Sequence, residues 1–96
     1  MNREEILTAL KNDKQLLSEK FGVEEIALFG SYARNEQTDD SDIDVLVTLR
    51  EPKLSHLVGV LEFLENAFKH KVDLTRKGPH LRKNFLTYIQ PDLIYA

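Results

Sequence analysis

Residues 41–49 read Ser-Asp-Ile-Asp-Val-Leu-Val-Thr-Leu, and most of them are apolar or β-branched. Such a stretch is typical of a strand, and we predict one over residues 42–49. Because side chains alternate between the two faces of a strand, Asp42 and Asp44 share one face, and the apolar side chains between and after them point the other way. The strand therefore has an acidic face and a face suited to a core.

A third acid follows the same pattern farther along the chain. Asp73 stands between Val72 and Leu74 in residues 71–75, which we predict to be a short strand, so Asp73 turns away from the core. If the two strands are neighbours, three carboxylates meet on one open face of the sheet. At a separation of about 5 Å and an effective dielectric constant of ~20, each pair of like charges costs roughly 3 kcal/mol. A shared proton or a hard divalent cation such as Mg²⁺ would offset this repulsion.

The segment before the acids is suited to binding phosphate. Residues 28–34 read Leu-Phe-Gly-Ser-Tyr-Ala-Arg and follow an apolar run that we predict to be a strand over residues 23–29. Gly30 allows a tight turn into a helix start, where backbone amides attract an anion, and the Ser31 hydroxyl adds a donor. Ten residues separate Ser31 from Asp42. Turn and acids could thus hold a triphosphate and its magnesium side by side, as two-metal phosphoryl chemistry requires.

Periodic segments around these motifs complete a two-layer α/β fold. Apolar residues recur at helical spacing in two long segments, and a third segment follows Gly78 and Pro79, a pair typical of the approach to a helix. We predict helices over residues 4–21, 54–70 and 81–88, the first of them opened by a capping pair, Asn2 and Glu5. The fold class is α/β, with a small mixed sheet, helices on one face and an open acidic face, and we expect one domain over residues 1–96.

Composition narrows the class of protein. The 96 residues carry a net charge of −3, which disfavours broad binding to DNA or RNA. There is no cysteine, and we see neither a signal peptide nor an apolar run long enough for a membrane span. We therefore expect a cytoplasmic protein without disulfides.

Together these motifs resemble a known family. Gly30-Ser31, the Asp42-Ile43-Asp44 strand and the later Val72-Asp73-Leu74 are similar to the nucleotidyltransferase superfamily, and in particular to its minimal, MntA-like antitoxin branch. The resemblance covers nearly the whole chain. The tail departs from the family pattern, since Pro91 interrupts the last element.

The resemblance implies an enzyme, a cytoplasmic antitoxin that forms a hetero-oligomer with a HEPN-type ribonuclease toxin and moves AMP from ATP onto a tyrosine of that toxin. It implies two Mg²⁺ ions, with Asp42, Asp44 and Asp73 as catalytic and metal-binding residues. Gly30, Ser31 and Arg34 would bind the nucleotide. Two other functions stay open: nucleotidyl transfer to a small molecule, and neutralisation of the toxin by binding alone.

Each motif also has a purely structural interpretation. Gly30-Ser31 could be an ordinary turn, and the two acids of the second strand could be a solvated face. Arg34 is as well explained by solvation as by a phosphate contact, and the cations after the third strand, Arg76 and Lys77 among them, are typical of a solvent-facing cluster. Asp73 favours the catalytic interpretation, because a third acid of matching parity on a separate strand is hard to explain otherwise.

Overall fold

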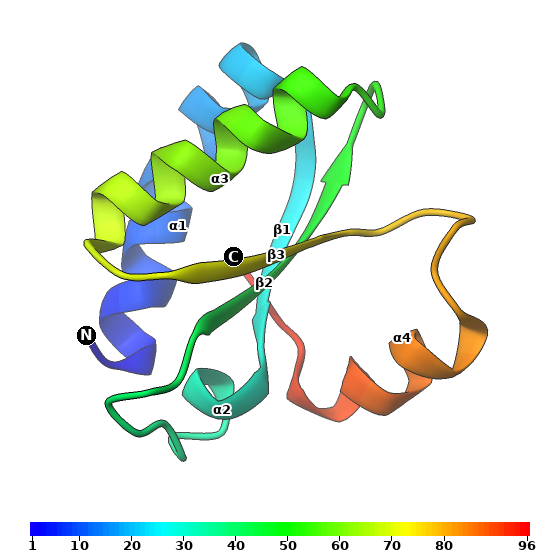
Figure 1. Ribbon diagram of the computed structural model, residues 1–96. Helices are drawn as coiled ribbons and strands as arrows, with labels where there is room; N and C mark the ends of the chain where they lie inside the picture. Colours follow the sequence, from blue (N-terminus) through cyan, green and yellow to red (C-terminus); the bar gives the residue numbers. More distant parts are fainter.

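The computed structural model describes residues 1–96 and has a four-stranded sheet with helices on both sides (Figure 1). The strand order is β3-β2-β1-β4. In chain order the elements are α1 (Arg3–Phe21), β1 (Val23–Phe29), α2 (Gly30–Ala33), β2 (Ile43–Leu49), α3 (Leu54–Phe68), β3 (Val72–Arg76), α4 (Lys83–Ile89), the 3₁₀ helix η1 (Gln90–Asp92) and β4 (Ile94–Tyr95). The α/β class with a mixed sheet is confirmed: β2 pairs antiparallel with β1 and parallel with β3.

Local signals explain where α1 begins and ends. Asn2 and Glu5 form the predicted capping box, in which each side chain bonds the other residue's backbone amide at 2.9 Å. The helix stops at Gly22, whose φ of 70° is the left-handed conformation that closes helices. The chain can then turn directly into β1.

The larger core lies between the sheet and the α1–α3 layer, which Figure 1 shows as two neighbouring helices. Ile43, Val45 and Val47 of β2 point into this core, as predicted from strand alternation. In β1 the pairing register shifts between Val23 and Glu25, so Val23 and Ile26 both reach the same core although they are three residues apart.

The opposite face of the sheet is only partly open, which corrects the expectation that all helices lie on one face. α4 and η1 pack there, and Ile89 is buried against Ala27, Phe29 and Leu46. Side chains two residues apart on a strand share a face, so Leu46 lies on the same face of the sheet as Asp44. An apolar side chain on that face is stabilised by burial, which α4 provides. The acidic face is therefore a cleft beside α4 rather than a bare sheet.

The last strand was not predicted. β4 has two residues, which pair with Ala27 and Leu28 of β1, and so short a segment has no detectable period. Pro91 lies in η1, just before β4, where a missing backbone N–H costs nothing at the start of a helical turn.

No helix in the structure combines the length and apolar character that crossing a membrane requires.

Candidate active site

The topology brings three strand ends to one edge of the sheet. β1 ends at Phe29, and because β2 is antiparallel to it, Phe29 pairs with Asp44 at the start of β2. β3 runs parallel to β2, so its start lies at the same edge and Asp73 is the register partner of Asp44. The Gly30 turn, predicted to bind phosphate, and two of the three predicted acids therefore meet, although they are distant in sequence.

Gly30 turns the chain directly over Asp44. Its φ is 75°, a conformation that side-chain-bearing residues rarely adopt. A Cβ atom at this position would lie 2.1 Å from Asp44 Oδ2 and 3.2 Å from Asp44 Cβ. The turn thus needs glycine for its backbone angle and for the space that the carboxylate occupies.

Asp44 is the most perturbed acid in the chain. Its pKa is raised to about 6, first because the carboxyl group is half-buried, and then because Asp73 and Asp42 are negative neighbours. Arg34 acts in the opposite direction and lowers the pKa. A bound cation or a proton would stabilise a half-buried carboxyl group that has negative neighbours. Carboxyl groups whose pKa is shifted by burial and by neighbouring charges are common in catalytic sites.

Asp42 occupies a different position from the other two acids. It lies just before β2 and contributes its charge to the environment of Asp44. No group of three Asp, Glu, His or Cys side chains in the chain has the spacing of metal ligands. The structure therefore brings Asp44 and Asp73 together as an adjacent pair, with Asp42 nearby but outside a three-ligand set.

The pair suits a hard cation in its chemistry. Two carboxylates supply the oxygen ligands that Mg²⁺ prefers, and Mg²⁺ commonly binds through one or two carboxylates, with water and substrate phosphates filling its other positions. Burial and the neighbouring negative charges, which together raise the pKa of Asp44, both disfavour its ionised form, and a bound cation would stabilise that form.

A hollow of about 360 Å³ opens beside these groups. It is lined by a polar group of residues, Gly30, Ser31, Arg34, Asp44, Asp73 and Asp92, and by an apolar and aromatic group, Phe29, Phe85, Tyr88 and Ile89, which we call the aromatic wall. The predicted nucleotide-binding residues all line it. The glycine turn, the acidic pair and the aromatic wall thus share one cleft.

Arg34 lines the hollow but is bound to two acids. Its Nη1 donates to Asp92 Oδ2 at 2.6 Å, and its Nε donates to Glu36 Oε1 at 3.0 Å. These hydrogen bonds, that to Asp92 first, raise the pKa of Arg34. The guanidinium is therefore positioned at the site, and a phosphate would compete with its present carboxylate partners.

The aromatic wall and Asp92 are the parts of the site that sequence reasoning missed. Phe85 and Tyr88 are three residues apart on α4, a spacing that places them on one helix face, and this was the available signal. Asp92 had no signal, because its contact with Arg34 joins residues 58 positions apart.

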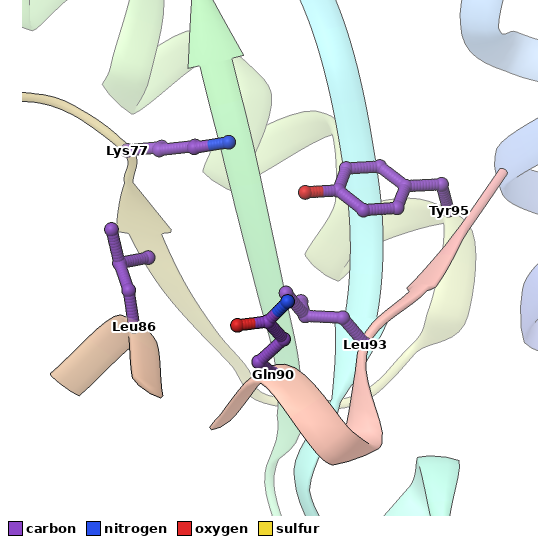
Figure 2. A pocket seen from close by; sticks show the side chains of 5 residues that line it. All are labelled: Lys77, Leu86, Gln90, Leu93 and Tyr95. Atoms are coloured by element: carbon purple, nitrogen blue, oxygen red, sulfur yellow. The ribbon is translucent and has the colours of Figure 1, made fainter. Parts of the chain in front are cut away.

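A second, larger hollow of about 410 Å³ lies against the same helix. Figure 2 shows Lys77 and Tyr95 pointing toward each other across the strands, above Gln90 and Leu93, with Leu86 at the side. It contains no carboxylate. Asp44, Asp73 and the Gly30 turn belong to the smaller hollow, which is the candidate active site.

Sequence comparison agrees with this geometry. A family model described as the nucleotidyltransferase domain matches residues 10–94, which include the turn and all three acids. The chain belongs to the nucleotidyltransferase domain family.

The similarity to known proteins extends over nearly the whole chain. The protein adenylyltransferase MntA of Thermococcus cleftensis is 39% identical over 94 residues, which cover 97% of this chain and 94% of the relative. MJ1379 of Methanocaldococcus jannaschii, proposed to be a protein adenylyltransferase, is 43% identical over 99 residues, covering 96% and 95% of the two chains. A solved structure proposed to be a minimal nucleotidyltransferase has a TM-score of 0.79 at 27% identity and covers 98% of this nucleotidyltransferase and 95% of its own chain.

Proposed function

We propose that this nucleotidyltransferase is an antitoxin that moves AMP from ATP onto a tyrosine of a HEPN-type toxin, with Mg²⁺ as its metal. The observation that carries the proposal is the placement of Asp44 and Asp73 as register partners beside the Gly30 turn. Carboxylates that can hold a cation, next to a turn whose backbone amides can bind phosphate, are what transfer of a nucleotidyl group requires.

The similar proteins support this acceptor and this nucleotide. The relative from Thermococcus cleftensis is named a protein adenylyltransferase. A structure of the same fold, with a TM-score of 0.63, is that of a tri-AMPylated HEPN toxin of Shewanella oneidensis in complex with an MNT antitoxin. Another, with a TM-score of 0.55 and 28% identity, is a toxin–antitoxin structure with AMP-PNP. We infer a hetero-oligomer with such a toxin and a cytoplasmic location from the same relationship.

In the proposed reaction, the residues of the cleft have separate tasks. Backbone amides at Gly30 and Ser31 hold the β- and γ-phosphates, and Arg34 steadies the triphosphate. Asp44 and Asp73 would hold Mg²⁺, with Asp42 as a third candidate ligand. When bound, the ion would neutralise charge on the phosphates and polarise the α-phosphate.

Asp73, which is exposed at the rim, orients the acceptor hydroxyl and receives its proton. The tyrosine oxygen forms a bond to the α-phosphorus, and the bond from that phosphorus to the β-phosphate's bridging oxygen breaks. Pyrophosphate leaves with the electron pair of the broken bond, and AMP remains on the tyrosine. An oxygen nucleophile in line with its leaving group is the arrangement common to phosphoryl transfer.

The proposal is tested by incubating the purified protein with its HEPN-type partner, ATP and Mg²⁺, followed by mass spectrometry of the partner. We expect additions of about 329 Da, one AMP residue each, on tyrosine. EDTA and the variant Asp44→Asn should both abolish the addition. The matched control is Asp40→Asn, an exposed loop acid, which should transfer at the wild-type rate.

An unmodified partner in the presence of the wild-type protein, ATP and Mg²⁺ would overturn the assignment. If Asp44→Asn still protects cells from the toxin, neutralisation occurs by binding alone. Labelled AMP on a small molecule in place of the toxin would identify a different acceptor class.

A further inference from the structure

The aromatic wall of the cleft contains one side chain whose exposure the fold does not explain. Tyr88 is 82% exposed, although it lies on α4 beside residues that pack on the sheet. It lines the same hollow as Ser31 and Asp44. A large aromatic ring left in water at the mouth of a charged cleft is available to a ligand.

Phe85, the other aromatic residue of α4 in the hollow, is already engaged. Its ring meets that of Phe29 edge to face, with centroids 6.0 Å apart and an angle of 88° between the planes. It also packs against the buried cluster that includes Ile89. The ring of Phe85 is therefore already packed against protein, whereas the ring of Tyr88, one helical turn farther on, is exposed to solvent.

The lining of the hollow contains groups suited to both parts of a nucleotide. The carboxylates, the glycine turn and Arg34 suit a triphosphate and its cation, and the aromatic and aliphatic side chains suit a base. A nucleotide whose triphosphate binds the charged groups can therefore place its base against the aromatic side chains of the same hollow. At about 360 Å³ the hollow has the size of a small-molecule site.

We propose that Tyr88 is the stacking platform for the nucleobase. This inference rests on the proposed function, because it takes a nucleotide as the ligand. Stacking uses the π-face that every base has, so Tyr88 supplies affinity with little discrimination between bases. We accordingly expect the protein to bind ATP and GTP with similar affinity.

The test compares ligands with and without a base. Binding of a magnesium complex of AMP-PNP and of magnesium tripolyphosphate is measured by calorimetry for the wild type, Tyr88→Ala, Tyr88→Phe and the matched control Thr87→Ala, an exposed neighbour on α4. Tyr88→Ala should weaken AMP-PNP about 5- to 100-fold and leave tripolyphosphate unchanged. Tyr88→Phe, which keeps the ring, and Thr87→Ala should bind both ligands as the wild type does.

The possible failures have different meanings. Unchanged AMP-PNP affinity in Tyr88→Ala, or an equal loss of both ligands, overturns the platform alone, with circular dichroism used to confirm that the variant is folded. A wild-type protein that binds neither ligand overturns the proposed function itself. An AMP adduct on Tyr88 after incubation with Mg²⁺ and ATP would make this residue an acceptor and would also overturn the stacking role.

Discussion

Gly30 shows how a single residue can be fixed by two independent constraints. Its positive φ sets the direction in which the chain leaves β1, and its missing side chain leaves room for the carboxylate of Asp44. Backbone conformation and packing therefore both require a residue without a Cβ at this position.

We expect Gly30→Ala to destabilise the protein by about 1–2 kcal/mol, the usual cost of a left-handed conformation for a residue with a side chain. It should also displace Asp44 and abolish nucleotide binding, because the new Cβ overlaps Asp44 Oδ2. Urea unfolding and calorimetry measure the two effects. Gly78→Ala is the control, since Gly78 has no positive φ and a Cβ there meets the flexible end of Arg76. Equal behaviour of the two variants would contradict the account.

The two interpretations of Arg34 can be separated through its partners. If Arg34 contacts phosphate, Asp92→Asn should raise nucleotide affinity several-fold, because it frees the guanidinium and removes a negative charge from the hollow. Arg34→Ala should lower that affinity. Calorimetry with AMP-PNP measures both, with Glu62→Gln, exposed on α3, as the control. No change in either variant would mean that Arg34 only joins α2 to η1.

Among the elements, helix and strand positions were predictable wherever the apolar pattern was long enough. The strand over residues 23–29 is confirmed without change, and the other five predicted elements differ from the structure by one or two residues at their ends. The placement of α4 was not predictable, because its apolar residues fit either a partner surface or the sheet. The two residues of β4 are extended because they pair with β1. This pairing depends on a distant part of the chain and could not be predicted from the segment itself.

α3 contains a glycine that looks unfavourable until its neighbour is considered. Gly59 costs about 1 kcal/mol in a helix interior relative to alanine. In the structure a Cβ at this position would lie 2.3 Å from Cε1 of Phe21. Gly59 therefore allows α3 to approach the end of α1 closely.

We expect Gly59→Ala to destabilise the protein by about 1–3 kcal/mol despite its better helix propensity, because the ring of Phe21 must move. Chemical unfolding measures the change. The double variant Gly59→Ala with Phe21→Leu should recover part of the loss, and Ser55→Ala, exposed on the same helix, should have little effect. A more stable Gly59→Ala would show that the two helices are not in close contact.

At the scale of the whole molecule, the site opposes the stability of the fold. Asp44 and Asp73 lie side by side, and with no cation between them their charges repel. The raised pKa of Asp44, about 6 against an ordinary value of about 4 when unfolded, means that the folded state holds the proton more tightly. The contribution of Asp44 to the stability should therefore be fully present below about pH 4, decrease as the pH rises from about 4 to 6, and be lost above about pH 6.

Asp73→Asn should accordingly make the metal-free protein more stable at pH 7.5 while it abolishes AMP transfer. Burial is the largest cause of the raised pKa of Asp44 and the charge of Asp73 is the next, so the variant removes only part of the unfavourable energy. Solvent screening of the half-exposed group reduces the effect further, and we expect a gain of about 1 kcal/mol or less. Thermal unfolding at pH 5 and pH 7.5 in EDTA measures it, and the gain should be smaller at pH 5. A less stable variant at pH 7.5 would contradict the repulsion between the two acids.

The sequence carried more information about the acids than about the rest of the cleft. The alternation of side chains along two strands was enough to predict that Asp44 and Asp73 turn away from the core. The two acids are adjacent because β2 and β3 are neighbouring strands of the sheet. Asp42 lies before β2 begins, so strand alternation no longer fixes its direction. Tyr88 and Asp92 line the hollow only because α4 and η1 pack back against the sheet. No local sequence pattern indicates this packing.

The parallel pairing of β2 with β3 also sets an order of assembly during translation. The chain must travel the whole length of α3 before Asp73 can reach Asp44. A ribosome that has released everything up to α3 has already made the phosphate turn and two of the acids, yet their remaining partner is still to be synthesised. A nascent chain that ends before β3 therefore lacks Asp73, and the cleft is complete only after α4 and η1 have also been synthesised.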